Sequence, residues 1–124
     1  MTKCVLVVED HEMNLKLICD LLEAHGVRTV AAMEGEAALD LAREHRPDLI
    51  LMDLQLPGIS GFDVTLHLKA DTDLRDIPVV AVTALARERD KETALEAGCD
   101  AYIRKPISAA SFIATVNEFL ERTS

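Results

Sequence analysis

Several short apolar runs in this sequence are followed by polar groups that could together hold a divalent cation and accept a phosphoryl group. In chain order these groups are Glu9, Asp10, Asp53, Thr83 and Lys105. Carboxylates brought together repel one another, by about 4 kcal/mol per pair at 4 Å and an effective dielectric constant of 20. A divalent cation relieves that repulsion, and a carboxylate beside the cation can attack phosphorus. The set therefore predicts an aspartyl-phosphate site.

The donor atoms of this set indicate which cation it would hold. Ligands that are all oxygen select a hard cation, and a half-open acidic cleft that retains water suits Mg²⁺ better than Ca²⁺. Lys105 would supply a second positive charge beside the phosphoryl group, and Thr83 a hydroxyl donor. We therefore expect Mg²⁺ as the cofactor.

Each of these residues also has a plainer explanation. Glu9 and Asp10 fit equally well at the start of a helix, where acidic side chains are favoured. Thr83 alone fits a turn at the end of a strand. Asp53 is harder to explain in this way, because it follows four apolar residues directly and precedes a Pro-Gly turn. We therefore favour a functional role for Asp53, and the case for the others depends on their joint placement.

The apolar pattern alternates between strand and helix along the whole chain. Runs rich in β-branched residues or leucine predict buried strands at 4–8, 28–32, 48–52, 78–82 and 101–103. Amphipathic stripes between and after them predict five helices. The stripe residues are Met13, Leu17, Ile18, Leu21 and Leu22; Ala38, Leu41 and Ala42; Val64 and Leu68; Ala94, Leu95 and Ala97; and Phe112, Ile113, Val116, Phe119 and Leu120. Helix ends are expected at Gly26, Pro47 and Gly98, and a helix cap at Ser108.

Five strand–helix units in succession predict an α/β fold with a doubly wound, five-stranded parallel sheet and helices on both faces. The common small arrangement of this kind has the strand order 2-1-3-4-5. In that order the first and third strands are neighbours about 4.8 Å apart. Glu9, Asp10 and Asp53 then converge at the carboxyl edge of the sheet, where ligands bind in such folds.

Composition narrows the classes of partner. The 124 residues carry a formal charge of −9, which disfavours nucleic acid and anionic membrane surfaces and favours proteins and cations. Neither a membrane-spanning run nor a signal peptide is predicted, so we expect a cytoplasmic protein.

Cys4, Cys19 and Cys99 form no CxxC pair and are expected to be free thiols. His25 and His45 are expected at helix ends, where a cation meets the helix dipole.

Four motifs resemble those of the receiver domain of bacterial two-component response regulators. They are VVED at 7–10, LMDLQLPGISG at 51–61, VTA at 82–84 and YIRKP at 102–106. The resemblance extends over essentially the whole chain and implies a single receiver domain of flavodoxin-like fold at 1–124. Within this family the chain resembles more specifically the stand-alone receivers that control the cell cycle of alphaproteobacteria. The shared segments are DLLEA at 20–24, IPVVAVTA at 77–84 and KPIS at 105–108.

The resemblance implies a role for each site residue. Asp53 would accept a phosphoryl group from a phosphohistidine of a sensor kinase. Mg²⁺ would be held by Asp10, by Asp53 and by the backbone carbonyl of Gln55, with Glu9 acting through water. Lys105 would pair with the phosphoryl group.

The resemblance also implies a switch. The bond between Lys105 and Pro106 would be cis. Thr83 would move toward the phosphoryl oxygens while Tyr102 turns inward, and this would repack the face formed by the fourth helix, fifth strand and fifth helix. Tyr102 is equally compatible with a half-buried sheet residue of no special role. Gln55 and Leu85 occupy positions that the family uses to tune the lifetime of the phosphoryl group.

No output domain is expected after the fifth helix, so the signal would pass through protein contact or a phosphorelay. The expected partners are sensor histidine kinases or phosphatases and a downstream protein, without nucleic acid or membrane insertion, and the chain would be a monomer or weak dimer. A role in cell-cycle or polarity control is expected. We expect a phosphoacceptor switch rather than an enzyme, with only self-catalysed phosphotransfer and slow self-dephosphorylation.

Three other functions share parts of this pattern. A flavodoxin-like FMN carrier needs a loop rich in Gly, Ser and Thr after the first strand, where this sequence has DHEMN at 10–14. An Mg²⁺-dependent phosphatase with an aspartyl intermediate needs a general acid near Asp53, and Gln55 cannot serve as one. The third possibility is an adaptor protein whose phosphorylation is vestigial, although the intact acidic set argues against it.

Overall fold

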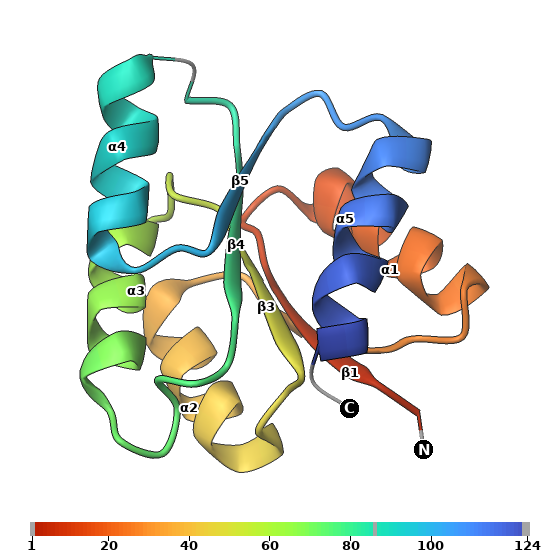
Figure 1. The fold of residues 1–124 in the computed structure, drawn as a ribbon, viewed down its shortest axis with the longest axis horizontal. Helices are drawn as coiled ribbons and strands as arrows, with labels where there is room; N and C mark the ends of the chain where they lie inside the picture. The colour runs from red at the N-terminus through yellow and green to blue at the C-terminus, as the bar shows by residue number, and fades with distance from the viewer. Residues whose placement is uncertain (1, 86, 123–124) are drawn as a thin grey trace.

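The computed structural model describes residues 2–85 and 87–122, and its five described strands form one parallel sheet (Figure 1). The strands are β1 (Cys4–Val8), β2 (Arg28–Ala32), β3 (Leu49–Met52), β4 (Val79–Thr83) and β5 (Ala101–Arg104). Their order across the sheet is β2-β1-β3-β4-β5, and each neighbouring pair is parallel. The predicted fold and strand order are confirmed.

Two strands begin one residue later than predicted. The carboxylate of Asp48 accepts the backbone N–H of Cys4 at 2.8 Å, and Asp48 therefore precedes β3 instead of beginning it. Pro78 has no N–H for the sheet, so β4 begins at Val79. At its other end β4 extends to Thr83, because the carbonyl of Thr83 accepts the N–H of Lys105 at 2.9 Å.

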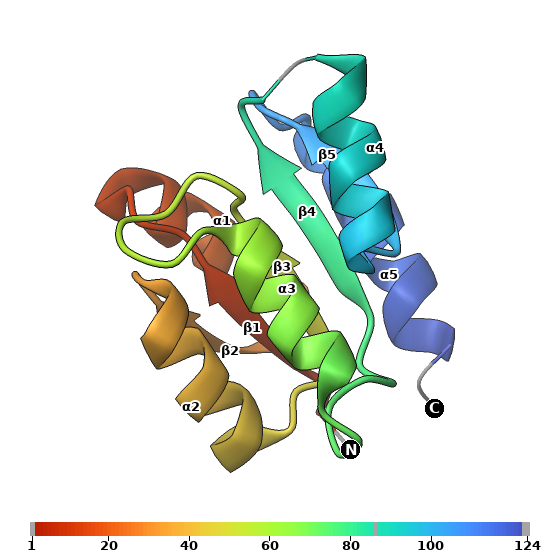
Figure 2. The same ribbon diagram turned by 90° about the vertical axis from the view of Figure 1, so that its left-hand side faces the viewer.

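Five helices cover both faces of the sheet. They are α1 (Glu12–Ala24), α2 (Gly35–His45), α3 (Gly61–Ala70), α4 (Glu88–Ala97) and α5 (Ala109–Arg122). Helices α1 and α5 lie on one face, and α2, α3 and α4 lie on the other (Figures 1 and 2). Within the described residues, none of these helices combines the length and apolar character that a membrane span requires.

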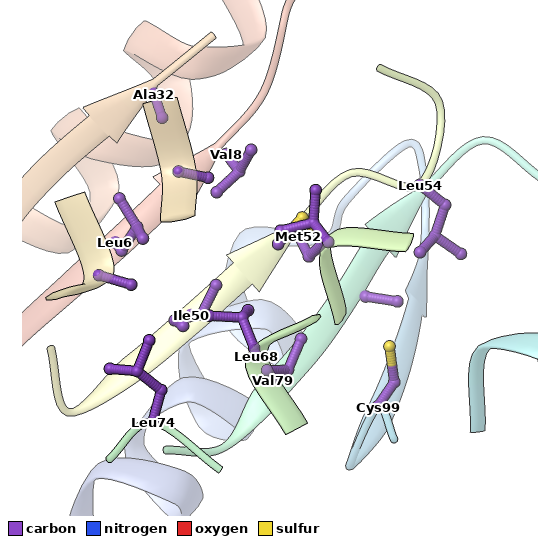
Figure 3. Packing of buried hydrophobic residues seen from close by; sticks show 14 of the residues in the cluster. Leu6, Val8, Ala32, Ile50, Met52, Leu54, Leu68, Leu74, Val79 and Cys99 are labelled. Carbon is purple, nitrogen blue, oxygen red and sulfur yellow. The ribbon is translucent and has the colours of Figure 1, made fainter. Parts of the chain in front are cut away.

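Alternate residues of each central strand enter opposite cores, as the two-residue period of a strand requires. On one side Leu6, Ile50 and Val79 pack with α2 and α3 side chains such as Leu68 (Figure 3). On the other side Val5, Leu49 and Val80 pack with residues of α1 and α5. Because both faces are covered, the strands are almost wholly apolar, and their polar chemistry is confined to the strand ends.

Three residues of the predicted apolar stripes are exposed. Met13 is 86% exposed, Leu17 52% and Leu95 44%. In α1 the buried residues are Ile18 and Leu22. Leu17 instead lines a cleft with residues that follow β5. The first half of the predicted α1 stripe is therefore a surface feature beside the carboxyl edge of the sheet.

Most helix ends lie close to their predicted positions. The C-cap of α1 is His25, whose Nδ1 lies 2.9 Å from the carbonyl oxygen of Leu21, and Gly26 follows it with φ +79°. Gly98 caps α4 with φ +116°. The helix α2 ends at His45, before the predicted stop at Pro47, because Arg46 already adopts a left-handed conformation with φ +43°.

Candidate functional site

The predicted site residues lie at one edge of the sheet because the backbone pairing continues past the strand ends. The N–H of Asp53 donates to the carbonyl of Val8 at 3.0 Å, one residue beyond β3. The N–H of Lys105 donates to the carbonyl of Thr83 at 2.9 Å, one residue beyond β5. The first bond places Asp53 beside the end of β1, and the second places Lys105 beside the end of β4.

Lys105 connects the two buried carboxylates of the site. Its ammonium donates to Glu9 Oε1 at 2.9 Å, to Glu9 Oε2 at 2.8 Å and to Asp53 Oδ2 at 3.0 Å. The side chains of Glu9 and Asp53 are only 1% and 5% exposed, and that of Lys105 is 17% exposed. The charges are therefore paired within a largely dehydrated pocket, as buried charges must be.

The electrostatics of the pocket follow from this arrangement. Burial raises the pKa of Glu9, the adjoining carboxylate of Asp53 raises it further, and Lys105 opposes both effects. Burial opposes the charge on Lys105, yet hydrogen bonds to Glu9 and Asp53 raise its pKa overall. Lys105 is therefore a permanent cation at neutral pH, and the pocket retains an excess of carboxylate oxygen that a further cation would stabilise.

Asp10 supplies the observation that tests whether a metal fits. Its Oδ1 is buried and has no hydrogen-bond partner among the described residues. A buried carboxylate oxygen without a donor is costly, and a cation satisfies it. Glu9, Asp10 and Asp53 offer only oxygen, which matches the preference of Mg²⁺. The donor set therefore fits this ion.

The structure also brings a histidine to these carboxylates. Ligand atoms of Glu9, Asp10 and His11 lie within 4.8 Å of one another. His11 is 73% exposed and lies 3.5 Å from Asp10 Oδ1. Nitrogen is not the donor that a hard cation prefers, so His11 does not extend the Mg²⁺ set. The ammonium of Lys105 joins Asp53 to Glu9.

The loop after β3 is held tightly against Asp53. The N–H of Gln55 donates to Asp53 Oδ1 at 3.0 Å, and the N–H of Gly61 donates to the carbonyl of Leu54 at 3.1 Å. A side chain at position 61 would place its Cβ 2.2 Å from the backbone oxygen of Asp53. Only glycine allows α3 to begin this close to the end of β3.

Thr83 and Tyr102 are joined through one intervening residue. The hydroxyl of Thr83, which is fully buried, accepts the N–H of Leu85 at 3.3 Å. The hydroxyl of Tyr102 donates to the carbonyl of the same Leu85. A movement of the Thr83 hydroxyl would release the N–H of Leu85, so the two side chains are mechanically connected. Next to this relay, the peptide bond between Lys105 and Pro106 is cis.

The site opens into a cleft of about 400 Å³ on the α1 side of the sheet. The cleft is lined by Asn14, Leu17, Ile18, Ala84, Lys105, Pro106 and Ile107. Sequence reasoning identified Lys105 and Pro106 but missed Asn14, whose amide donates to Glu9 Oε1 at 3.2 Å. The signal that could have found it is an asparagine in the first turn of a helix, five residues after a candidate ligand.

Known proteins resemble this chain in sequence along almost its whole length. A family model described as the response regulator receiver domain matches residues 5–117. The polar-differentiation response regulator DivK of Brucella ovis is 57% identical over 120 residues, which cover 97% of this chain and 98% of that protein. DivK of Brucella anthropi is similar to the same extent.

Solved structures show the same similarity. The signal receiver domain of a histidine kinase from Syntrophus aciditrophicus superposes with a TM-score of 0.90 at 32% identity, covering 97% of this chain and 91% of that one. The receiver domain of sensor histidine kinase PA1611 from Pseudomonas aeruginosa PAO1 has a TM-score of 0.90 at 31% identity, covering 98% and 99%. That structure holds a magnesium ion coordinated in its active site cleft.

Proposed function

We propose, from the premise that this chain belongs to the response regulator receiver domain family, that it is a stand-alone response regulator phosphorylated on Asp53. One observation carries the assignment. The carboxylate of Asp53, at the end of the central strand, is hydrogen-bonded to Lys105, which also contacts Glu9, and Asp10 lies next to Glu9. Such a pocket combines a nucleophile with positive charge for the group that it accepts.

The transfer itself is a simple displacement. A carboxylate oxygen of Asp53 forms a bond to phosphorus while the bond from phosphorus to a histidine nitrogen of the donor breaks. The electron pair of the broken bond stays on that nitrogen, and a proton on the other ring nitrogen allows the histidine to leave as neutral imidazole. Lys105 stabilises the charge on the transferred oxygens.

Receiver domains bind Mg²⁺ at their acidic pocket, and the residues of this chain fit that ion. We assign its ligands to Asp10, Asp53 and the backbone carbonyl of Gln55, with Glu9 acting through water. When bound, Mg²⁺ neutralises the phosphoryl oxygens. Asp10 contributes a buried carboxylate oxygen that has no hydrogen-bond partner among the described residues.

The hydroxyl of Thr83 is the proposed sensor of the phosphoryl group. When it turns toward the phosphoryl oxygens it leaves the N–H of Leu85, whose carbonyl holds Tyr102. The face of α4, β5 and α5 then repacks around Tyr102. This converts a local electrostatic event into a change of surface, through which a downstream protein is recognised.

The cleft beside Asp53 is the proposed docking surface of a sensor histidine kinase. Leu17 and Ile107 line it next to Lys105, and Met13 in the first turn of α1 is 86% exposed. An apolar rim around a charged pocket suits a helical partner that must deliver a phosphohistidine to Asp53.

The similarity to polar-differentiation regulators supports a role in cell-cycle and polarity control. We place this role in the cytoplasm.

Phosphorylation by a small donor tests the proposal. Purified protein is incubated with acetyl phosphate and Mg²⁺, and intact mass is measured. We expect one added phosphoryl group on the wild type and none on Asp53→Asn. Asp40→Asn is the matched control, because Asp40 is 83% exposed on α2 and should not affect labelling. Equal labelling of Asp53→Asn and wild type would contradict the assignment.

A further inference from the structure

Asn14 makes a contact that the helix containing it does not require. It is the third residue of α1, after the N-cap His11. A polar side chain at this position ordinarily reaches back to the N-cap backbone. The amide of Asn14 instead donates to Glu9 Oε1 at 3.2 Å and lines the cleft beside Lys105. Asparagine is also a weak helix former. Its place is therefore better explained by the phosphorylation site than by the helix.

The hydrogen-bond capacity of Lys105 gives this contact a purpose. A lysine ammonium has three donors, and all three are used by Glu9 Oε1, Glu9 Oε2 and Asp53 Oδ2. Lys105 must therefore give up an existing bond before it can contact a phosphoryl oxygen on Asp53. Glu9 is 1% exposed, so little water is available to replace a donor that it loses. Asn14 is the other side chain that donates to Glu9 among the described residues.

We propose that Asn14 is a positioning residue that holds Glu9 when Lys105 turns to the phosphoryl group, and so favours the phosphorylated state. The inference rests on the function proposed for Asp53. Before phosphorylation Glu9 accepts hydrogen bonds from both Lys105 and Asn14, so loss of Asn14 destabilises this state only slightly. When Lys105 gives up a bond to Glu9 in order to contact the phosphoryl group, Glu9 depends more on the bond from Asn14, and loss of Asn14 then leaves its buried carboxylate with too few donors. Because the contact is stronger in one state, it shifts the equilibrium toward that state.

Binding of beryllofluoride, a stable mimic of the phosphoryl group, tests this inference without turnover. Its affinity is measured by calorimetry in saturating Mg²⁺, and thermal denaturation is measured in parallel without Mg²⁺. We expect Asn14→Ala to weaken beryllofluoride binding about tenfold, equivalent to about 1.4 kcal/mol. Asn117→Ala is the matched control, because Asn117 is an exposed asparagine within α5, away from the site, and should bind as wild type does.

Asn14→Leu separates a positioning role from a structural one. Leucine has a similar size and shape, carries no charge and is a stronger helix former than asparagine, so thermal stability should be kept or raised. The donor to Glu9 is lost, so beryllofluoride should bind at least tenfold more weakly. Wild-type affinity in both Asn14 variants would overturn the inference while leaving the function of Asp53 intact. A wild-type protein that acetyl phosphate does not label would overturn the function, and this inference with it.

Discussion

Lys105 and Glu9 form a two-point contact across 96 residues of sequence, with the lysine ammonium 2.9 and 2.8 Å from the two carboxylate oxygens. The same ammonium lies 3.0 Å from Asp53. One ammonium group therefore contacts two buried carboxylates and offsets part of their negative charge. Lys105 and a divalent cation therefore have related electrostatic roles, because each offsets the charge of these carboxylates.

Replacement of Lys105 by methionine should make stability depend on Mg²⁺. Without the ion, Glu9 and Asp53 lose their shared cation, and we expect a loss of about 3 kcal/mol in the free energy of unfolding. Mg²⁺ should restore part of it, because it binds the folded protein and relieves the same repulsion. Urea denaturation with and without Mg²⁺ measures both effects. Lys16→Met, which removes an exposed pair with Asp20, should leave the midpoint nearly unchanged in either condition. A Lys105→Met protein that Mg²⁺ stabilises no more than wild type would refute this prediction.

Replacement of Gly61 by alanine should disrupt the site through the backbone. The new Cβ would lie 2.2 Å from the backbone oxygen of Asp53 and 2.7 Å from Leu54 Cα, so the start of α3 must move. We expect a loss of about 1–3 kcal/mol in stability and weaker labelling of Asp53 by acetyl phosphate. The comparison is Gly26→Ala, which meets nothing within 4 Å but has φ +79°. That variant should lose about 1 kcal/mol and keep full labelling. Undiminished labelling in Gly61→Ala would show that the loop adjusts freely.

Ionisation of Tyr102 should reduce stability at alkaline pH. Burial raises the pKa of Tyr102 above its ordinary value, and nearby Asp90 adds to the effect. The folded state therefore keeps the phenolic proton more tightly than the unfolded state. The resulting stability is complete below about pH 10 and is lost as pH rises through the folded pKa. The chain has one tyrosine and no tryptophan, so tyrosinate absorbance follows this group alone. The free energy of unfolding, measured against pH, should not show this alkaline loss in Tyr102→Phe. The same alkaline loss in Tyr102→Phe and in the wild type would contradict the assignment.

Loss of the Thr83 hydroxyl should disconnect the site from Tyr102. Beryllofluoride with Mg²⁺ should change the tyrosine fluorescence of the wild type, because the N–H of Leu85 is released and its carbonyl moves with Tyr102. Thr83→Ala has no hydroxyl to move, so we expect little change after beryllofluoride binds. Thr93→Ala, on the exposed side of α4, is the control and should respond as wild type does. A full fluorescence change in Thr83→Ala would exclude this relay.

Replacement of Leu85 by glutamate should shorten the life of the phosphoryl group. An apolar side chain next to the site hinders an attacking water, whereas a carboxylate can orient one. We expect dephosphorylation to become several-fold faster, measured as the decay of phosphorylated mass after acetyl phosphate is removed. Leu66→Glu introduces the same charge at an exposed leucine of α3 and should leave the rate unchanged. An unchanged rate in Leu85→Glu would remove this explanation. Gln55 occupies the other position expected to tune the lifetime of the phosphoryl group; its side chain is exposed, and its effect can be measured in the same way.

The stripe predicted for α1 shows where sequence periodicity reaches its limit. Met13 and Leu17 fit the same apolar period as Ile18 and Leu22, yet only the latter two are buried. Periodicity predicts which residues share a helix face, but the extent of the sheet beneath that face decides which of them are covered. Leu17 lines the cleft beside Lys105 and Met13 lies about one turn before it on α1, where an exposed apolar surface is the proposed docking surface of a sensor kinase.

What the sequence determined by itself was local: the strand and helix pattern, the polar residues that end each strand, and hence the kinds of group available. The apolar runs around Asp53 and the change of period between elements are properties of short segments, so they can be read directly from residue order. The pairing of Lys105 with Glu9 and the diversion of Asn14 from its helix to Glu9 were decided only by the tertiary structure. Each depends on how distant elements pack and on which donors remain to a buried carboxylate, and residue spacing does not record that geometry.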